Sequence, residues 1–372
     1  MPAIRARLLL VVSLIVPVAT SSAAGAEQEV TLGEFTVSED AMCDLRDRWV
    51  EQLLERYPEG TWAPMEFRLN DAQLATMGLP SAGVLASRDY PTPTLVSRDG
   101  RTAPVSTTAL AQAVHGSMDP AVASYAGIGC LGIRPGAWLL IIDGGGISLC
   151  SMAHVYGGAG AYDISTAGHC GKGGATATVI AAVGNRSDVA GPVLLDFGRF
   201  SKSTDGGLGR DYALIDIDSA YQHLVTPTMC FWGGPRGTYA REGGIVEVDW
   251  NHGEVSVTPD PFLAQPIVHY GHGLGIGTGG TPRAGAAIHW GRTHFMFSGA
   301  IVFGDSGSGA NTVTGDAVGA NLQAAGIITH IYVDPLMRDG VGIMGGTRAT
   351  AVSGSLANGQ YVPYPLPLPG FP

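Results

Sequence analysis

Three short segments of this 372-residue chain carry side chains whose types suit nucleophilic catalysis. A serine lies between glycines in residues 304–309 (GDSGSG), a histidine lies in residues 166–170 (TAGHC), and an aspartate begins residues 211–215 (DYALI). The histidine and the aspartate are 42 positions apart, and the aspartate and the serine are 95 apart. Only a folded structure could bring three such distant side chains into contact.

The chemistry that these residue types could perform is acyl transfer. A serine is a weak nucleophile until a base takes its proton, and His169 can supply that base for Ser306. Asp211 can hold the far nitrogen of the imidazole in the required tautomer. The backbone amides of Gly304 and Ser306 can converge on a developing oxyanion, each stabilising it by about 3–4 kcal/mol. The pattern therefore predicts a Ser-His-Asp triad with an oxyanion hole.

The chain after about residue 130 is typical of a β protein that could position these side chains. Short apolar runs alternate there with glycine clusters, and helical periodicity is nearly absent. We expect antiparallel strands, in a barrel or a sandwich, near residues 137–142, 162–165, 177–183, 213–217, 245–248, 267–269, 286–290 and 326–333.

The order His, Asp, Ser and the two boxes TAGHC and GDSG resemble the chymotrypsin-like (trypsin-fold) serine endopeptidases, most of all the streptogrisin-like secreted peptidases of bacteria. The resemblance covers roughly residues 127–350. It implies an all-β fold of two antiparallel six-stranded β-barrels with the active site between them, preceded by a small, partly helical pro-region. His169 and Asp211 would come from the first barrel and Ser306 from the second. The implied activity is hydrolysis of peptide bonds in proteins or peptides, without a metal or other cofactor.

Asp211 has two rivals for the acidic role, because Asp216 and Asp218 follow closely. We prefer Asp211 because an apolar strand, residues 212–215, continues directly from it, as in the family pattern. The same resemblance places Ala300 at the base of the primary specificity pocket, which disfavours a demand for Lys or Arg. Thr329 and His330 would line one wall of the cleft, and His330 could favour an acidic substrate residue. Asp305 needs a positive partner that the sequence does not reveal.

The amino-terminal residues are typical of a secretory signal. Arg5 and Arg7 precede a short apolar run, and small residues follow as far as Ala26, so residues 1–26 are predicted to be a signal peptide. Residues 27–126 are then a pro-region with one amphipathic helix near 39–57, removed by a cut between about 100 and 130, and it would act as a transient intramolecular partner. Residues 127–358 form the protease domain, and 359–372 form a Pro-rich tail. The mature protein is expected to be secreted and extracellular.

The five cysteines fit a secreted chain if Cys43 lies in a part that is later removed. The other four allow three pairings. We favour Cys150 with Cys170, because a strand-loop-strand connection could join them, and a disulfide beside the catalytic histidine is also what the resemblance implies. Cys130 with Cys230 follows by elimination.

Several other functions are disfavoured by composition and spacing. The net charge is −11 and no basic stripe occurs, so no nucleic-acid partner is expected. No apolar stretch after the signal reaches membrane length, so no membrane partner is expected once the signal is removed. The pair His269 and His272, with His289 and His294, lacks the further ligands of a metal site, so none is predicted. Two alternatives stay open: an inactive secreted binding protein on the same fold, and a hydrolase on another fold. The order Ser, Asp, His with G-x-S-x-G would indicate an α/β-hydrolase, and the order here is the reverse.

Overall fold

The structure is a computed structural model of the chain, and it describes residues 29–32, 35–38, 61–65, 67–97, 99–116, 132–143, 146–158, 160–181, 192–229, 232–240, 243–244, 246–249, 254–257, 265–271, 281–301, 304–314, 321–333 and 340–355. The chain forms two compact units, one of residues 1–56 with 315–320 and the other of residues 57–314 with 321–372. In the first unit, strands β1 (Glu29–Leu32) and β2 (Phe35–Ser38) form an antiparallel hairpin. Everything described below belongs to the second unit.

The first barrel is built from strands that pair in the order β7-β6-β10-β11-β12-β9-β8. Their bounds are β6 (Trp138–Asp143), β7 (Gly146–Ser151), β8 (Val155–Gly158), β9 (Ala161–Thr166), β10 (Thr176–Ala181), β11 (Val193–Asp205) and β12 (Asp211–Ile217). The two outermost strands, β7 and β8, are consecutive in the chain and only residues 152–154 separate them. Residues 146–158 therefore act as one bent strand that pairs with β6 at one end and β9 at the other, which closes six strands into a ring.

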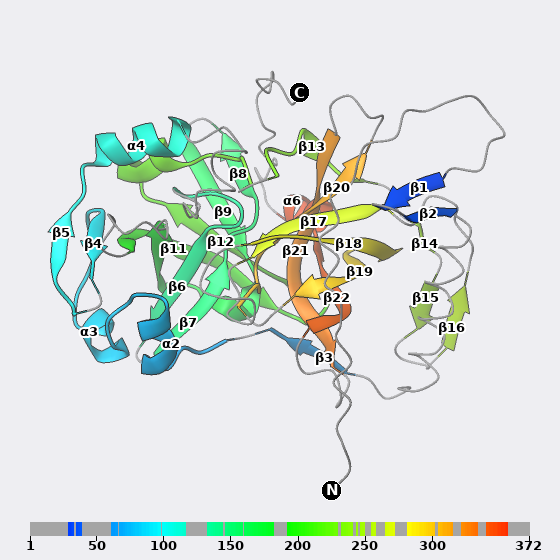
Figure 1. Cartoon of the computed structure of the whole chain (residues 1–372), viewed down its shortest axis with the longest axis horizontal. Coiled ribbons are helices and arrows are strands. Elements are labelled where there is room, and N and C mark those ends of the chain that lie inside the picture. The colour runs from blue at the N-terminus through cyan, green and yellow to red at the C-terminus, as the bar shows by residue number, and fades with distance from the viewer. Residues whose placement is uncertain are drawn as a thin grey trace, which may run out of the picture. The chain divides into compact units, whose positions relative to one another are not determined.

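The second barrel closes through a direct strand pair. Its strands are β17 (Pro266–Gly271), β18 (Thr281–Trp290), β19 (His294–Ile301), β20 (Gly309–Thr314), β21 (Asn321–Val333) and β22 (Gly340–Arg348). They pair in the order β21-β20-β17-β18-β19-β22, and β22 pairs again with β21. Short strands β13 (Gly237–Thr238) and β14 (Gly243–Gly244) pair with β21 and β18, and helix α6 (Ala349–Gly354) follows β22. Figure 1 shows the first barrel in green and the second in yellow to orange.

These strands form because apolar side chains point into each ring. In the first barrel the inward set includes Leu139, Phe197 and Ile215, all fully buried. In the second barrel Phe295 and Phe297, two residues apart on β19, stack with ring centroids 5.9 Å apart. Residues two apart in a strand share one face, so these two rings point to the same side of β19.

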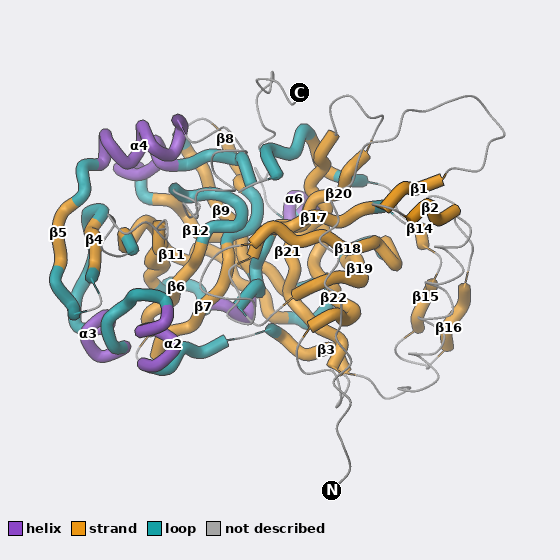
Figure 2. Tube along the Cα trace, in the orientation of Figure 1, coloured by secondary structure: helices purple, strands orange, loops and turns teal. Residues whose placement is uncertain are grey.

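Residues 61–116 pack against both barrels. They contain β3 (Thr61–Pro64), α2 (Asp71–Thr76), α3 (Ala82–Ala86), β4 (Thr94–Val96), β5 (Thr102–Pro104) and α4 (Thr107–Gly116). Figure 2 shows α2 and α3 close together, and β4 and β5 as strands between α3 and α4. Leu74 and Leu85 from the two small helices are fully buried in one cluster with Trp138 and Leu149 of the first barrel, and β3 and β4 extend the barrel sheets by pairing with β21 and β11. Two 3-10 helices, η1 (Gly168–Cys170) and η2 (Ser219–Leu224), and the hairpin β15 (Val246–Asp249) with β16 (Glu254–Val257) complete the described elements.

The predicted fold class, two antiparallel six-stranded barrels preceded by a partly helical segment, is confirmed. Every strand expected from an apolar run has a counterpart among β6, β9, β10, β12, β15, β17, β18 and β21. The signal peptide, the helix expected near 39–57 and the tail 359–372 lie outside the described residues, as do Cys43, Cys130 and Cys230. Among the residues that the structure describes, no helix combines the length and hydropathy of a transmembrane span.

Candidate active site

The histidine and aspartate boxes meet because their strands are neighbours. β9 ends at Thr166, and the chain turns through η1, which carries His169. β12 begins at Asp211 and pairs antiparallel with β9, with Ala213 opposite Thr166. The end of one strand and the start of the other therefore lie at the same edge of the first barrel. Asp216 and Asp218, the rivals of Asp211, lie at the other end of β12 and just beyond it.

Asp211 is fully buried, and all three hydrogen bonds of its carboxylate are made with the histidine box. Oδ1 accepts hydrogen bonds from the backbone N–H groups of Gly168, at 2.5 Å, and His169, at 3.0 Å. Oδ2 lies 2.6 Å from His169 Nδ1. The Asp211 main chain is held in turn by Thr347 of β22, whose hydroxyl accepts from the Asp211 N–H and donates to its carbonyl. The carboxylate is thereby placed to keep the proton of His169 on Nδ1 and to orient the ring.

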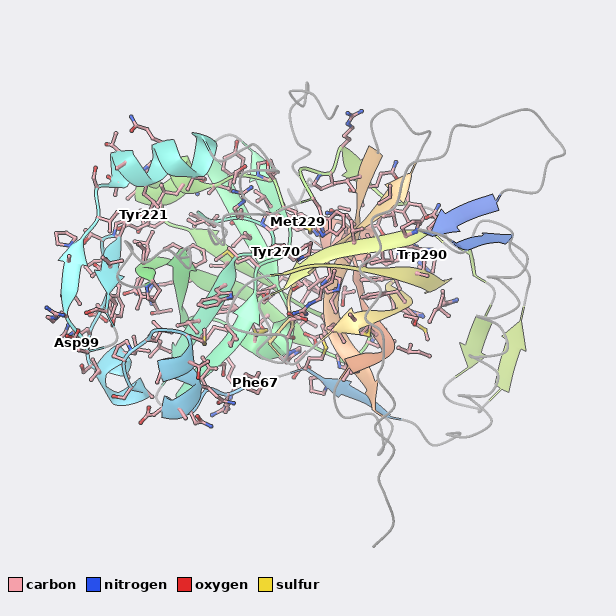
Figure 3. The ribbon with its side chains drawn as sticks, in the orientation of Figure 1. Phe67, Asp99, Tyr221, Met229, Tyr270 and Trp290 are labelled. Atoms are coloured by element: carbon pink, nitrogen blue, oxygen red, sulfur yellow. A yellow bond between two sulfur atoms is a disulfide. The ribbon has the colours of Figure 1, made fainter. Side chains whose placement is uncertain are left out.

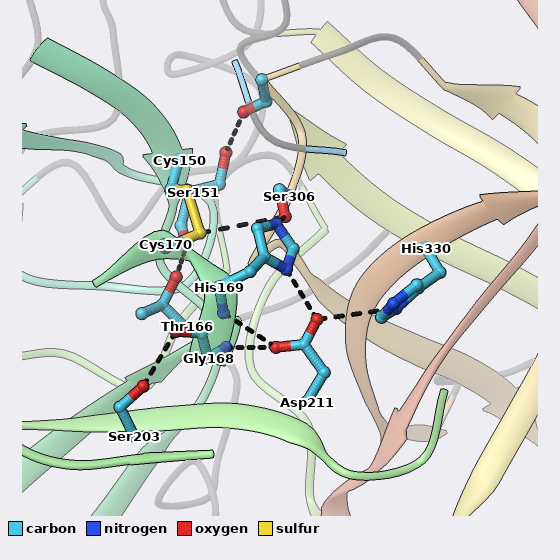
Figure 4. Close-up of a disulfide and its surroundings, with 11 residues drawn as sticks. Cys150, Ser151, Thr166, Gly168, His169, Cys170, Ser203, Asp211, Ser306 and His330 are labelled. Atoms are coloured by element: carbon cyan, nitrogen blue, oxygen red, sulfur yellow. Dashed lines mark hydrogen bonds and ion pairs between the residues drawn. A yellow bond between two sulfur atoms is a disulfide. The ribbon is translucent and has the colours of Figure 1, made fainter. Parts of the chain in front are cut away.

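Ser306 comes from the loop between β19 and β20 of the second barrel, and its Oγ is hydrogen bonded to His169 Nε2. Figure 4 shows the imidazole lying between Ser306 and Asp211. The loop is fixed from both barrels: the Ser306 carbonyl accepts from Ser151 N–H at 2.7 Å, and Gly307 N–H donates to the Ile328 carbonyl at 2.8 Å. With Nδ1 bound to a carboxylate, Nε2 is the nitrogen free to accept the serine proton.

The glycines beside Ser306 allow a loop conformation that other residues would strain. Gly304 and Gly307 have φ of +100° and +85°, in the left-handed region. A Cβ at Gly307 would also collide with the Thr166 side chain and the Ser151 carbonyl, so the loop could not approach the histidine box. Among the described residues, no group accepts a hydrogen bond from the amides of Gly304 and Ser306, which were expected to hold an oxyanion.

The partner of Asp305 is Arg283, a residue that the sequence did not single out. The two side chains form an ion pair and are 3% (Arg283) and 0% (Asp305) exposed. Burial lowers the pKa of Arg283 to about 10, so it still carries its charge near neutral pH. Gly271 leaves the space for this pair, because a Cβ there would run into the Asp305 carboxylate. One signal was available: Arg283 is the only acidic or basic residue, histidines aside, in the otherwise uncharged strand β18.

The expected disulfide between Cys150 and Cys170 is present. It joins β7 to η1, and Cys170 directly follows His169. The Cys170 Sγ lies 3.8 Å from Ser306 Oγ, so the covalent link fixes the chain beside the contact between His169 and Ser306 (Figure 4).

The three residues expected to bind substrate are placed differently from one another. Thr329 and His330 are buried on β21, where the Thr329 hydroxyl lies 2.8 Å from His330 Nδ1. His330 Nδ1 also lies 3.5 Å from Asp211 Oδ2, so this ring is directed at the carboxylate that contacts His169. Burial lowers the pKa of His330, against the smaller opposing effect of Asp211. The Ala300 carbonyl lies 3.3 Å from Nε2 of the buried His269.

The remaining histidines form no metal site among the residues described. No group of three or more His, Cys, Asp or Glu side chains is arranged to hold a metal ion in that part of the chain. His289 and His294 lie with ring centroids 5.0 Å apart, and His272 lies outside the described residues.

Tyr270, labelled in Figure 3 near the junction of the barrels, is largely buried, and burial raises its pKa to about 12.

Solved structures with a similar fold include several proteases, whereas no protein-family model and no curated protein matches the chain. Protease A of Thermobifida fusca is 19% identical, with a TM-score of 0.38, over 62% of this chain and 98% of that chain. The Nocardiopsis protease NAPase is 17% identical, with a TM-score of 0.33, over 60% of this chain and 95% of that one. A glutamic acid-specific serine protease is 18% identical, with a TM-score of 0.33, over 60% of this chain and 97% of that chain.

Proposed function

We propose that this protein is a secreted serine endopeptidase that hydrolyses peptide bonds through Ser306, His169 and Asp211. The observation that supports the proposal most is the continuous contact from Ser306 Oγ to His169 Nε2, and from His169 Nδ1 to Asp211 Oδ2. A buried serine, histidine and aspartate from two barrels have no packing reason to meet in this order. The chain of contacts is what a general base needs in order to activate a nucleophile.

In the proposed reaction, Ser306 Oγ attacks the substrate carbonyl carbon while His169 Nε2 takes the serine proton. The amides of Gly304 and Ser306 stabilise the tetrahedral oxyanion, and Asp211 stabilises the imidazolium. His169 then gives its proton to the leaving amine, which departs and leaves an ester between Ser306 and the substrate. A water attacks that ester, again with His169 as base, and releases the acid and the free serine.

The buried ion pair beside Ser306 suits this mechanism. Asp305 precedes the nucleophile directly and its own carbonyl accepts from Ser308 N–H at 2.9 Å. Anchoring Asp305 on Arg283 therefore holds the turn that presents both oxyanion donors. We propose that secretion through residues 1–26 exposes the chain to an oxidising compartment, in which a disulfide such as Cys150–Cys170 persists.

The test is hydrolysis of an unfolded protein such as casein by the purified chain. The Ser306→Ala variant is expected to lose about 10⁶-fold in turnover, as does removal of a triad nucleophile elsewhere. The matched control is Ser201→Ala, since Ser201 lies on β11 of the first barrel and its hydroxyl bonds only a strand carbonyl, that of Leu214. Equal activity of the wild type and Ser306→Ala would refute the proposed nucleophile, and a folded wild type with no hydrolytic activity would favour a binding protein.

A further inference from the structure

The segment that precedes α2 runs along the second barrel as an added strand. β3 pairs antiparallel with β21, with Pro64 opposite His330, Ala63 opposite Ile331 and Thr61 opposite Val333. Met65 continues the ladder, because its N–H donates to the Thr329 carbonyl at 3.2 Å. Figure 1 shows β3 beside the orange strands of the second barrel, with the chain running on to α2 at the first barrel.

Two residues later the same segment pairs with the first barrel. Leu149 N–H of β7 donates to the Phe67 carbonyl at 2.9 Å, Arg68 bridges to Ser148, and Leu69 N–H donates to the Ile147 carbonyl at 2.8 Å. An extended chain that adds to exposed sheet edges in this way is a common mode of peptide recognition. Here one extended chain binds an edge of each barrel in succession.

Each pairing lies next to residues that are hydrogen bonded to the loop of Ser306. On the second barrel, Thr329 follows Ile328, which is hydrogen bonded to Gly307 and Ser308, the two residues after Ser306. On the first barrel, Leu149 precedes Cys150 and Ser151, and Ser151 N–H donates to the Ser306 carbonyl. Only one residue separates Met65 from Phe67, so the segment passes from one pairing to the other directly after Met65, between two strands that both carry hydrogen bonds to the Ser306 loop.

The side chains of this segment are buried or exposed in the order expected of a bound substrate. Met65 is 1% exposed, although its neighbour Pro64 is exposed. An inserted side chain immediately before the reacting carbonyl is the one that a protease specificity pocket holds. On the far side of the bond, Arg68 is exposed and Leu69 joins the buried cluster with Trp138.

We propose that residues 61–69 are an internal substrate of this protein, and that Ser306 cuts the Met65–Glu66 bond within the same molecule. The inference rests on the proposed endopeptidase function and extends it in two ways. It names a self-processing site, and it names the substrate class: an extended chain with a medium-sized apolar side chain before the cut bond. Until the cut is made, the segment occupies the cleft.

The chemical step balances with one water. Ser306 Oγ bonds to the Met65 carbonyl carbon and its proton passes to His169. The carbon–nitrogen bond to Glu66 then breaks, and the nitrogen leaves with the proton from His169 as a new amino terminus. Water next attacks the Met65 ester, one of its protons passing through His169 back to Ser306 Oγ, and Met65 becomes a carboxylate. No oxidant, metal or cofactor takes part.

The two products should separate in different ways. The piece that ends at Met65 is held in this unit by the short β3 ladder. The piece that begins at Glu66 is anchored by Leu69, Leu74, Leu79 and Leu85, buried in the cluster that includes Leu149. We therefore expect the first piece to dissociate and the second to stay on the barrels. This cut is distinct from the one expected between about residues 100 and 130, and the two give different amino termini.

The experiment follows the purified full chain with time by intact mass and amino-terminal sequencing. The wild type is expected to acquire an amino terminus at Glu66 at a rate independent of protein concentration, and Ser306→Ala is expected to stay whole between residues 61 and 69. Met65→Asp should slow the cut at least about 100-fold, because it buries an unpaired charge, while the volume-conserving Met65→Leu should stay within about threefold.

A peptide keeps the test independent of how the variants fold. The processed enzyme should cut the blocked peptide TWAPMEFRLN, the sequence of residues 61–70, at the Met–Glu bond alone, and should leave its Met65→Asp counterpart intact. An enzyme that hydrolyses casein yet leaves both this peptide and its own Met65–Glu66 bond whole would overturn the inference and leave the proposed function standing. A chain that cuts nothing would overturn both.

Discussion

The buried ion pair between Arg283 and Asp305 allows the closest test of how the serine loop is held. The perturbation is a double-mutant cycle of Arg283→Met, Asp305→Asn and the two together. The side chains of Arg283 and Asp305 are 3% and 0% exposed, so each single change leaves one charge buried without its partner. Removing one member of such a pair costs about 3–5 kcal/mol, which is on the order of a 10²- to 10⁴-fold shift in the unfolding equilibrium.

The stability of the double variant separates the energy of the ion pair from the other effects of each substitution. It leaves no uncompensated charge, so we expect it to be more stable than either single variant, even though its buried amide still costs about 1–3 kcal/mol. Reactivity should behave differently. Without the anchor, the amides of Gly304 and Ser306 lose their alignment, and labelling of Ser306 by a fluorophosphonate should fall by about 10²-fold or more in all three variants.

Stability is measured by urea unfolding followed by tryptophan fluorescence, in a Ser306→Ala background that prevents self-cleavage. Labelling rates are measured in the variants that retain Ser306. Two results would refute the reasoning: single variants that lose less than about 1 kcal/mol, or a double variant whose loss equals the sum of the single losses. Full labelling of Arg283→Met would refute the positioning role alone.

Three further outcomes are expected. Replacing Cys150 and Cys170 together by Ser, a pair 20 positions apart, should cost about 3 kcal/mol in urea unfolding, and a loss below about 1 kcal/mol would argue against the disulfide. Burial lowers the pKa of His154 to about 4, so the unfolded chain gains a proton there near pH 6.5 while the folded chain does not. The free energy of unfolding should therefore fall by about 3 kcal/mol from this group as pH drops from 6.5 to 4. His154→Gln, whose amide can still bond Asn311, should show a shallower loss in pH-dependent urea unfolding. Burial, then the hydrogen bond and charge of Asp216, raise the pKa of Asp163 to about 7, so the folded chain keeps a proton that the unfolded chain releases near pH 4 and stability falls as pH rises through 7. Asp163→Asn should therefore raise Tm at pH 8 and leave it unchanged below pH 4, unlike the exposed control Asp89→Asn, and an equal effect at both pH values would contradict the assignment.

The sequence predicted the strands that consist of an apolar run. It missed strands whose residues are largely polar and that form because a neighbouring strand pairs with them. β12 was expected, because residues 212–215 are apolar throughout and fully buried. β11 was missed, because its second half, after Phe200, is polar and only half-buried or exposed. Its register with β12 also shifts between Phe200 and Lys202, an irregularity that no period-two pattern reveals. Tertiary pairing decides such segments, and local propensity does not.

The candidate site shows the same division. His169, Asp211 and Ser306 could be named because each lies in a short box with its own local pattern. Arg283 could not, since β17 and β18 must pair before it reaches Asp305, and the missing side chain of Gly271 on β17 gives the ion pair its space. The place of Met65 in the cleft depends on two strand edges, from β21 and β7, that are far apart in the sequence.

The central claim is that His169 activates Ser306 for attack, and one measurement tests it most directly. A fluorophosphonate is allowed to react with the processed protein, and the modified residue is identified by tandem mass spectrometry of its fragments. We predict one label for each molecule, carried by Ser306, with the labelling rate reduced at least about 10³-fold in His169→Gln, which keeps a polar side chain but no base. A label on another residue, or a rate that is unchanged in His169→Gln, would contradict the claim.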